Sequence, residues 1–155
     1  MNIEELKQFV QEIVKEAKKL KDKHTNQIDA PVNYACIFSQ SQEEYEKLLE
    51  LTNKFGKVLK ETKNGLLFHL EPLETVSGKL KILKIRAPDP TRPEKGDADF
   101  TVKNYPKFKE EFLNKEGFKL IERDYMEMIE LMDKEFNVRV YFSDPPLDQQ
   151  LKIKQ

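Results

Sequence analysis

The sequence predicts an α+β fold in which a strand–helix–strand–strand–strand unit, βαβββ, occurs twice after an extra N-terminal helix. Three observations predict it. An amphipathic helical pattern opens the chain, segments with helix and strand periodicity then follow in the same order twice, and similar segments recur at a fixed spacing. The length of 155 residues suits one domain with two related halves rather than two independent domains.

Residues 2–23 are expected to form the N-terminal helix. Asn2, with Glu5 three residues later, has the pattern of a capping box. The apolar side chains recur every three or four positions: Ile3, Leu6, Phe9, Val10, Ile13, Val14, Ala17 and Leu20. Such a stripe is typical of a helix that packs on a core.

The first βαβββ unit is expected over residues 30–87. Ser41 and Glu44 are suited to cap its helix, and Gly56 is suited to end it. Asn64-Gly65 is a strong hairpin signal between two strands. The five elements are expected at 32–38 (strand), 42–55 (helix), 57–61, 66–71 and 79–87 (strands).

A linker over residues 88–97 separates the two units, because its prolines exclude a helix or a central strand. The second unit is expected over 98–142, and the tail over 143–155 is expected to lie along the surface or fray. The second set of elements is expected at 99–102 (strand), 106–115 (helix), 118–123, 125–131 and 137–142 (strands).

A direct sequence match supports the duplication. NKFGKVLKE at 53–61 resembles NKEGFKLIE at 114–122 in its Asn, Lys and Gly and in the strand pattern that follows. Gly56 and Gly117 are 61 residues apart in this match. We therefore expect two copies of one unit forming a curved mixed sheet around a cleft. The alternative is an α+β domain with two helices that are similar by chance.

The composition excludes several classes of function. A formal net charge of −1 argues against binding nucleic acid through overall positive charge, and the basic and aromatic residues are too few in any cluster to indicate a nucleic-acid partner. No apolar stretch is long enough to cross a membrane. One cysteine, Cys36, excludes an internal disulfide and suits a cytoplasmic location. The glycine-rich loops of nucleotide-binding proteins and the H-E-x-x-H motif are absent.

Strand alternation indicates which side chains line the cleft. Apolar residues on one face of a strand are expected to pack under a helix, so the polar residues between them point into the cleft. On the last strand of each unit these are Lys84 and Arg86, and Arg139 and Tyr141. Their donors favour a small anionic ligand such as a carboxylate or a phosphate. The alternative is that they lie on the solvated face of exposed strands.

A second group of polar side chains falls on the same face. One histidine and two carboxylates from different strands can hold a divalent metal ion. We take His69, Asp99 and Glu130 as the candidate metal ligands, with Glu127 as the alternative to Glu130. The alternative for His69 is a solvated strand residue with no ligand role. The alternative for Asp97 and Asp99 is a structural role at a turn and at the entry of a strand.

The order of the segments GKVLKETKNGLLFHLE, KLKILKIRAPDPTRPEKGDADFTV and FKLIER after the N-terminal helix resembles the YecM family. That family lies within the vicinal oxygen chelate superfamily of glyoxalases and extradiol dioxygenases, whose arrangement is a duplicated βαβββ. The resemblance covers residues 1–142 in layout and is specific from Gly56 to Val102. It implies a cleft that often holds a divalent metal, with ligands on the first and last strands of each unit.

This chain departs from that ligand pattern. Positively charged side chains at two of the four strands would repel a divalent ion, so the metal site is expected to be degraded or relocated. The matching positions on the first strands hold Asn33 or Tyr34 in the first unit and Asp99 in the second. Those on the last strands hold Lys84 or Arg86 in the first unit and Arg139 or Tyr141 in the second.

Three functions follow from these observations. The first is a small-molecule-binding protein of the vicinal oxygen chelate type whose cleft takes an anionic ligand. The second is a divalent-metal-dependent isomerase, lyase or oxygenase. The third is a non-enzymatic interaction domain that docks a partner through helix 2–23 or the proline-rich linker. The sequence assigns no catalytic residue and leaves a homodimer open.

Overall fold

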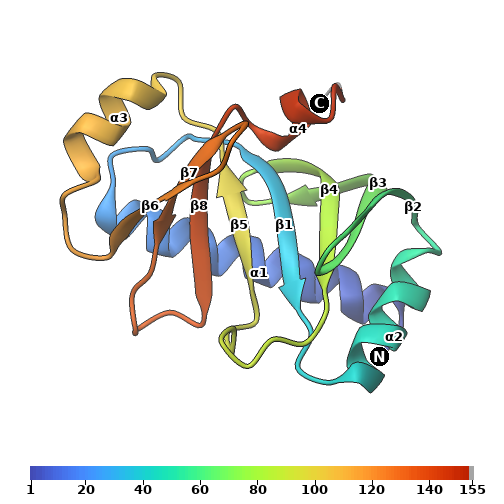
Figure 1. The fold of residues 1–155 in the computed structure, drawn as a ribbon. Helices are drawn as coiled ribbons and strands as arrows, with labels where there is room; N and C mark the ends of the chain where they lie inside the picture. Colours follow the sequence, from blue (N-terminus) through green and yellow to red (C-terminus); the bar gives the residue numbers. More distant parts are fainter. Residues whose placement is uncertain (154–155) are drawn as a thin grey trace.

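One curved, open sheet organises residues 1–153, the part of the chain that the computed structural model describes (Figure 1). Its strands are β1 (Val32–Phe38), β2 (Gly56–Thr62), β3 (Gly65–Thr75), β4 (Gly78–Arg86), β5 (Gly96–Phe100), β6 (Phe118–Glu122), β7 (Glu127–Leu131) and β8 (Val138–Asp144). The helices are α1 (Ile3–His24), α2 (Gln42–Thr52), α3 (Tyr105–Phe112) and α4 (Leu147–Gln150). The fold is therefore of the mixed α+β class, as the sequence predicts.

The strands lie in the order β2-β3-β4-β1-β5-β8-β7-β6. The two central strands, β1 and β5, pair antiparallel. Each is flanked by a parallel neighbour, β4 beside β1 and β8 beside β5, and antiparallel strands complete both sides. The strands on either side of residues 88–95 therefore occupy separate halves of one sheet.

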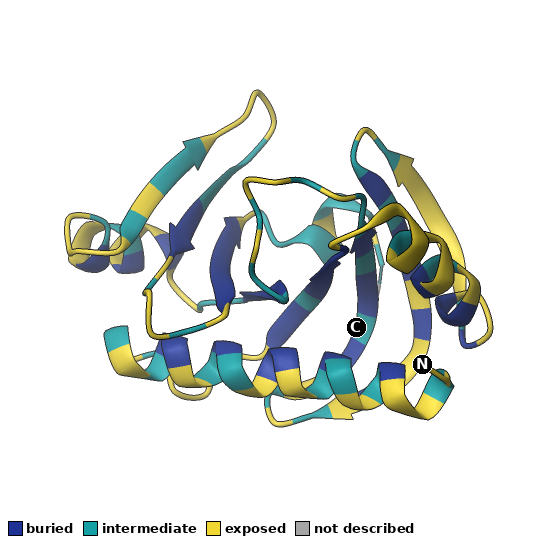
Figure 2. Cartoon of the chain, turned by 90° about the horizontal axis from the view of Figure 1, so that it is seen from below, coloured by how far each residue is buried: buried dark blue, intermediate teal, exposed yellow. Residues whose placement is uncertain are grey.

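Helix α1 crosses one face of this sheet and contacts strands of both halves (Figure 1). Its capping box is confirmed, since the Asn2 side chain accepts from the Glu5 amide at 2.8 Å and the Asn2 amide donates to the Glu5 carboxylate at 3.1 Å. Figure 2 shows the buried side of α1 turned toward the strands. Its most buried apolar residues are Leu6, Val10, Ile13, Val14, Ala17 and Leu20. The apolar stripe of residues 2–23 therefore belongs to the core, where no partner can dock.

Lys21, in the last turn of α1, is the exception to this apolar face because its side chain is 0% exposed. The ammonium donates to Asp22 at 2.7 Å, to the Ile28 carbonyl at 3.2 Å and to the Gln27 carbonyl, and it lies 5.2 Å from the centre of the Phe100 ring. Burial lowers the pKa of Lys21. The buried lysine thus ties the connector after α1 to the helix end.

The clearest boundary difference concerns β5, which begins at Gly96 inside the expected linker 88–97. Gly96 pairs with Ile37 of β1, and an added Cβ would overlap the Cys36 carbonyl oxygen. The glycine therefore serves a close approach between the two central strands rather than a turn. Smaller differences are that the helix expected at 42–55 ends at Thr52, β3 extends to Thr75, β8 extends to Asp144, and part of the tail forms α4.

We expect Gly96→Ala to destabilise the fold by about 2–3 kcal/mol, because the methyl group must displace backbone. The measurement is urea unfolding followed by circular dichroism. Gly78→Ala is the control, because an added Cβ there meets nothing within 4 Å although φ is +103°. It should cost only about 1 kcal/mol of backbone strain. Equal losses in the two variants would contradict the close-approach explanation.

Candidate functional site

The face of the central strands opposite α1 is the candidate functional site, and we call it the concave face. The outer strands of both halves rise beside the central ones on the side away from α1 (Figure 2). Strand neighbours such as Ala35, Ala98 and Val140 belong to the apolar core under α1. The residues that alternate with the core positions therefore face the concave side: Tyr34, Cys36, Phe38, Lys84, Arg86, Asp97, Asp99, Arg139, Tyr141 and Ser143.

The strand register arranges these side chains in rows. One row runs through Lys84, Cys36, Asp97 and Arg139 on β4, β1, β5 and β8. A second row runs through Tyr34, Asp99, Tyr141 and Glu130 on β1, β5, β8 and β7. Because neighbouring strands lie about 4.8 Å apart, the backbones of Lys84 and Asp97 are about 9–10 Å apart.

Glu130, Tyr141 and Arg139 form a buried network at the β7–β8 side of this face. The Tyr141 hydroxyl donates to the Glu130 carboxylate at 2.6 Å, and an Arg139 nitrogen lies 3.5 Å from the same carboxylate oxygen. Burial is the main cause that raises the pKa of Tyr141, and the Asp97 and Glu130 carboxylates add to the effect. Tyr141 is therefore a neutral hydrogen-bond donor at neutral pH.

The segment between β4 and β5 folds against this network. Arg139 donates through Nε to the Glu94 carboxylate at 2.9 Å and through Nη2 to the Thr91 carbonyl at 2.7 Å. Arg92 of the segment donates to the Tyr141 hydroxyl at 3.2 Å and lies over the Phe38 ring at 5.3 Å. The donors of Arg139 are thus engaged by carboxylates and carbonyls of the chain itself.

Asp97 and Asp99 lie on the concave face of β5 with little or no solvent exposure, 6% and 0%. The Oδ1 atom of each is buried and has no hydrogen-bond partner among residues 1–153. The other carboxylate oxygen of Asp99 accepts from the Ser143 hydroxyl.

Burial raises the pKa of both carboxyl groups. For Asp97 the pKa rises to about 7, although Arg92, Lys84, Arg86 and Arg139 oppose the rise. For Asp99 burial raises the pKa well above its usual value, the Ser143 hydroxyl opposes the rise, and the Asp97 carboxylate adds to it. Asp97 can therefore change its charge near neutral pH.

Lys84 and Arg86 of β4 face the same side and form fewer hydrogen bonds and ion pairs with the described residues than Arg139 does. The Lys84 ammonium donates to the Asn64 side-chain oxygen at 2.5 Å, and burial lowers the pKa of Lys84. Arg86 has one distant carboxylate, with its Nη2 3.5 Å from Asp89. The Arg86 Nε is buried and has no hydrogen-bond partner in the described part of the chain.

The four expected ligand-binding residues therefore share one face of the sheet. Lys84 and Arg86 lie on β4, and Arg139 and Tyr141 lie on β8, as strand alternation predicts. The surroundings of two of them differ from the expected open cleft, because Arg139 and Tyr141 form hydrogen bonds with glutamates of the same chain. Their role in binding stays a prediction.

The expected metal ligands are not brought together. His69 is exposed on β3, whereas Asp99 is buried on β5, and two strands lie between them, a separation of about 14 Å across the sheet. The Glu130 carboxylate is engaged by Tyr141. The alternative, Glu127, accepts from Tyr105 and pairs with a lysine. Within residues 1–153, no three His, Cys, Asp or Glu side chains form a group that could hold a metal ion.

Sequence reasoning missed the contribution of Arg92 and Glu94. Both lie in the proline-rich segment that we interpreted as a linker or a docking element, and their contacts are with Tyr141 and Arg139, more than 40 positions later. The available signal was weak: Arg92, one of the four arginines in the sequence, lies between two prolines. Local patterns do not report such distant pairs.

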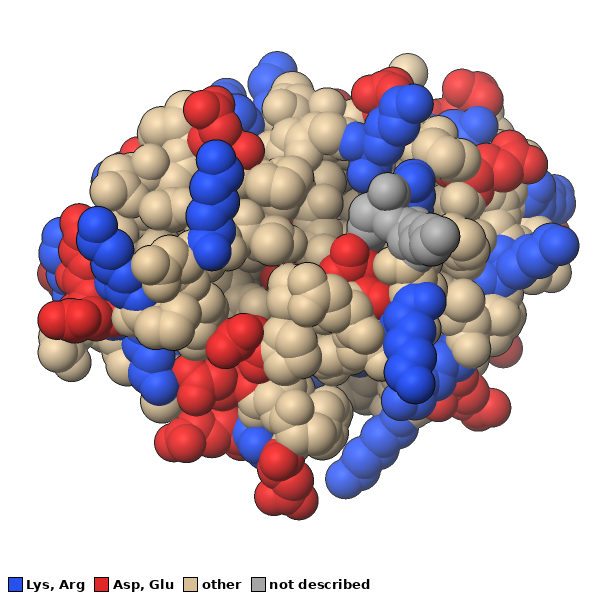
Figure 3. Space-filling view, turned by 90° about the horizontal axis from the view of Figure 1, so that it is seen from above, with Lys and Arg blue, Asp and Glu red and all other residues tan. Residues whose placement is uncertain are grey.

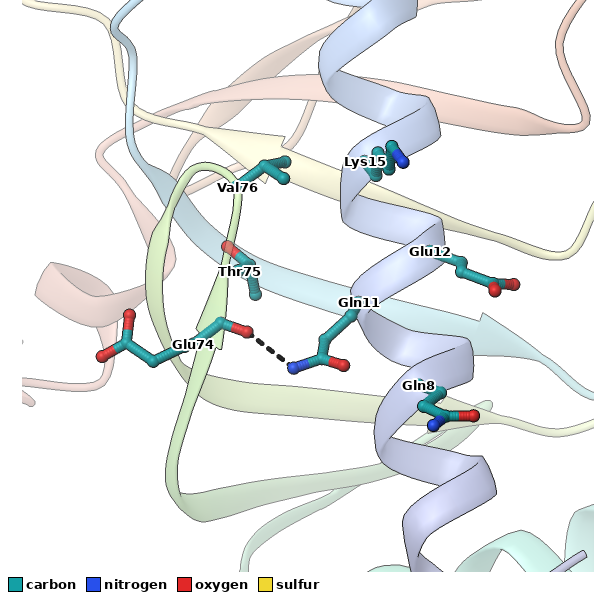
Figure 4. A pocket seen from close by; sticks show the side chains of 7 residues that line it. All are labelled: Gln8, Gln11, Glu12, Lys15, Glu74, Thr75 and Val76. Carbon is teal, nitrogen blue, oxygen red and sulfur yellow. Dashed lines mark hydrogen bonds between the residues drawn. The ribbon is translucent and has the colours of Figure 1, made fainter.

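Other surfaces of the protein show fewer features of a binding site. A groove between α1 and the β3–β4 hairpin is lined by exposed and half-buried side chains, where Gln11 donates to the Glu74 carbonyl at 2.9 Å (Figure 4). Figure 3 shows acidic and basic side chains interspersed over the face seen from above, with no large patch of one sign. None of the helices in residues 1–153 is both long and apolar enough to span a membrane.

Comparison with known proteins extends the description of the fold. A solved structure described as "Structural Genomics, Protein EC4020" superposes with a TM-score of 0.71 over 94% of this chain and 89% of that chain, at 13% sequence identity. The likeness shows a shared fold. No protein-family model and no curated protein matches the chain.

We expect the protein to lose stability as the pH rises from about 4 to about 7, in part through Asp97. The unfolded chain releases this proton near pH 3.8, whereas the folded chain holds it to about pH 7. Between these values the free energy of unfolding falls by up to about 1.4 kcal/mol per pH unit, and above them the effect is constant.

Asp97→Asn should remove this part of the pH dependence and raise the free energy of unfolding at pH 8. The measurement is urea unfolding at pH 4, 5, 6, 7 and 8. Asp124→Asn, at an exposed position, is the control and should follow the parent protein. A variant at Asp97 with the parent's pH profile would show that this carboxyl group is not the one that titrates.

Proposed function

We propose that this chain is a duplicated βαβββ protein of the vicinal oxygen chelate type, similar to the YecM family, and that its concave face binds a small anionic ligand. The strand arrangement supports the duplication. From the edge inward, one half of the sheet is ordered β2-β3-β4-β1 and the other β6-β7-β8-β5. The first and last strands of each half pair parallel.

The register at the centre of the sheet supports the duplication at the level of residues. Ala35 of β1 pairs with Ala98 of β5 across the junction. Ala35 also pairs with Leu83 of β4, and Ala98 pairs with Val140 of β8. An approximate two-fold axis through the alanine pair would therefore exchange the two halves.

The charge on the last strands favours an anion over a metal ion. Lys84 and Arg86 on β4, and Arg139 on β8, occupy strands where the resemblance expects metal ligands. Cations at these places repel a divalent ion and attract a negatively charged group. No observation favours the metal-dependent enzyme, which stays a hypothesis.

The single observation that carries the proposal is the buried Nε of Arg86, which has no hydrogen-bond partner among the described residues. Leaving a buried charged donor unpaired is costly, so an acceptor is expected there in the functional state. Lys84 lies two residues earlier on the same face of β4, and its one hydrogen-bond partner among the described residues is the neutral side chain of Asn64. Together they offer charge-assisted hydrogen bonds to a carboxylate or a phosphate.

We expect succinate or inorganic phosphate to raise the melting temperature of the parent protein and Arg86→Gln to weaken that binding about tenfold or more, because a charge-assisted hydrogen bond is lost. The measurement is a thermal shift titrated with each anion.

Arg123→Gln is the matched control, because it makes the same change at an exposed arginine at the end of β6. It should leave the titration unchanged. A variant at Arg86 that binds anions like the parent protein would overturn the proposed site.

A further inference from the structure

The concave face also holds acceptors that an anion alone does not satisfy. Five buried side-chain atoms in residues 1–153 have no hydrogen-bond partner, and three of them lie on this face: Nε of Arg86 and Oδ1 of Asp97 and Asp99. A carboxylate oxygen needs a donor, and a guanidinium nitrogen needs an acceptor. A ligand that completes this face must therefore present both.

The spacing of these groups sets the size of the ligand. Asp97 and Asp99 alternate along β5 on one face, so their backbones are about 7 Å apart. Lys84 shares the row of Asp97 across β1, with about 9–10 Å between their backbones, and its ammonium donates to Asn64. A chain of about four carbons can bridge from a basic side chain to one or both aspartates.

The charge around Asp97 decides which donor is suitable. Four cationic side chains influence the Asp97 carboxyl group. Arg139 is paired with Glu94 and Glu130, so the uncompensated positive charge near Asp97 comes mainly from Arg92, Lys84 and Arg86. A positively charged amino group on the ligand would be repelled by them. A neutral hydroxyl group donates a hydrogen bond without that penalty. Amino acids are therefore disfavoured, and hydroxylated acids are favoured.

We propose that the ligand is a small hydroxylated carboxylic acid, whose carboxylate binds Arg86 and Lys84 and whose hydroxyl group donates to Oδ1 of Asp97. This assignment rests on the proposed function. Oδ1 of Asp99, two residues further along β5, is a second buried acceptor without a partner among the described residues, and a ligand with a second hydroxyl group could donate to it.

The recognition of the hydroxyl group should depend on pH. Burial raises the pKa of Asp97 to about 7, so Asp97 is a charged acceptor at pH 8 and mostly neutral at pH 6. Hydrogen bonds to a charged acceptor are roughly twice as strong as those to a neutral one. The preference for a hydroxylated acid over its unhydroxylated counterpart should therefore be greater at pH 8.

The experiment compares succinate, malate and tartrate by isothermal titration calorimetry at pH 8. The three acids share a four-carbon chain and two carboxylates and differ in having zero, one and two hydroxyl groups. We expect malate or tartrate to bind the parent protein at least about tenfold more tightly than succinate. Asp97→Asn should reduce that preference to about threefold or less while succinate still binds, and Asp124→Asn should keep it.

The outcomes separate the two proposals. If neither the three acids nor inorganic phosphate binds the parent protein, the proposed function fails. If only phosphate binds, the anion site stands and the hydroxylated acid is overturned. If all three bind equally and Arg86→Gln weakens all of them, the anion site stands and the hydroxylated ligand is overturned. If Asp97→Asn keeps the preference, the role of Asp97 is overturned. Should that variant not fold, the parent protein decides at pH 6: a preference as large as at pH 8 overturns the role of Asp97.

Discussion

The antiparallel pairing of β1 with β5 is the constraint on which the rest of the structure depends. It joins the two halves into one sheet, and it requires Gly96, because the backbone of Cys36 leaves no room for a side chain there. The same pairing sets Asp97 beside Cys36 and Asp99 beside Tyr34, at the centre of the concave face. A shift of one residue would turn both aspartates into the apolar core under α1, where burial without partners is prohibitive.

The concave face shows how the chain keeps several charges buried. Arg139 forms ion pairs with both Glu94 and Glu130, and the Tyr141 hydroxyl donates a further hydrogen bond to Glu130. Asp97 and Asp99 lack such compensation within the described residues, and burial therefore shifts them toward the neutral acid. Half of the face is thus a closed network, and the other half holds buried polar atoms without hydrogen-bond partners among the described residues.

The sequence predicts elements and faces well, because both depend on local patterns. The range of β1 is confirmed at 32–38, the capping box of α1 is present, and Lys84 and Arg139 face the expected side. The expected metal ligands lie apart for a non-local reason: alternation gives the face of His69 and Asp99 but not the strand order that separates them. The beginning of β5 was missed because the steric role of Gly96 depends on a strand 60 positions earlier.

The course of α1 across both halves has a consequence for how the protein is made. The helix is synthesised before the strands, yet its stripe packs on β1 and β3 in one half and on β5 and β8 in the other. A nascent chain that has emerged only as far as β4 can cover part of that stripe and leaves the remainder exposed to water. The halves are therefore expected to reach stability as one cooperative unit once β8 has emerged, rather than successively during synthesis.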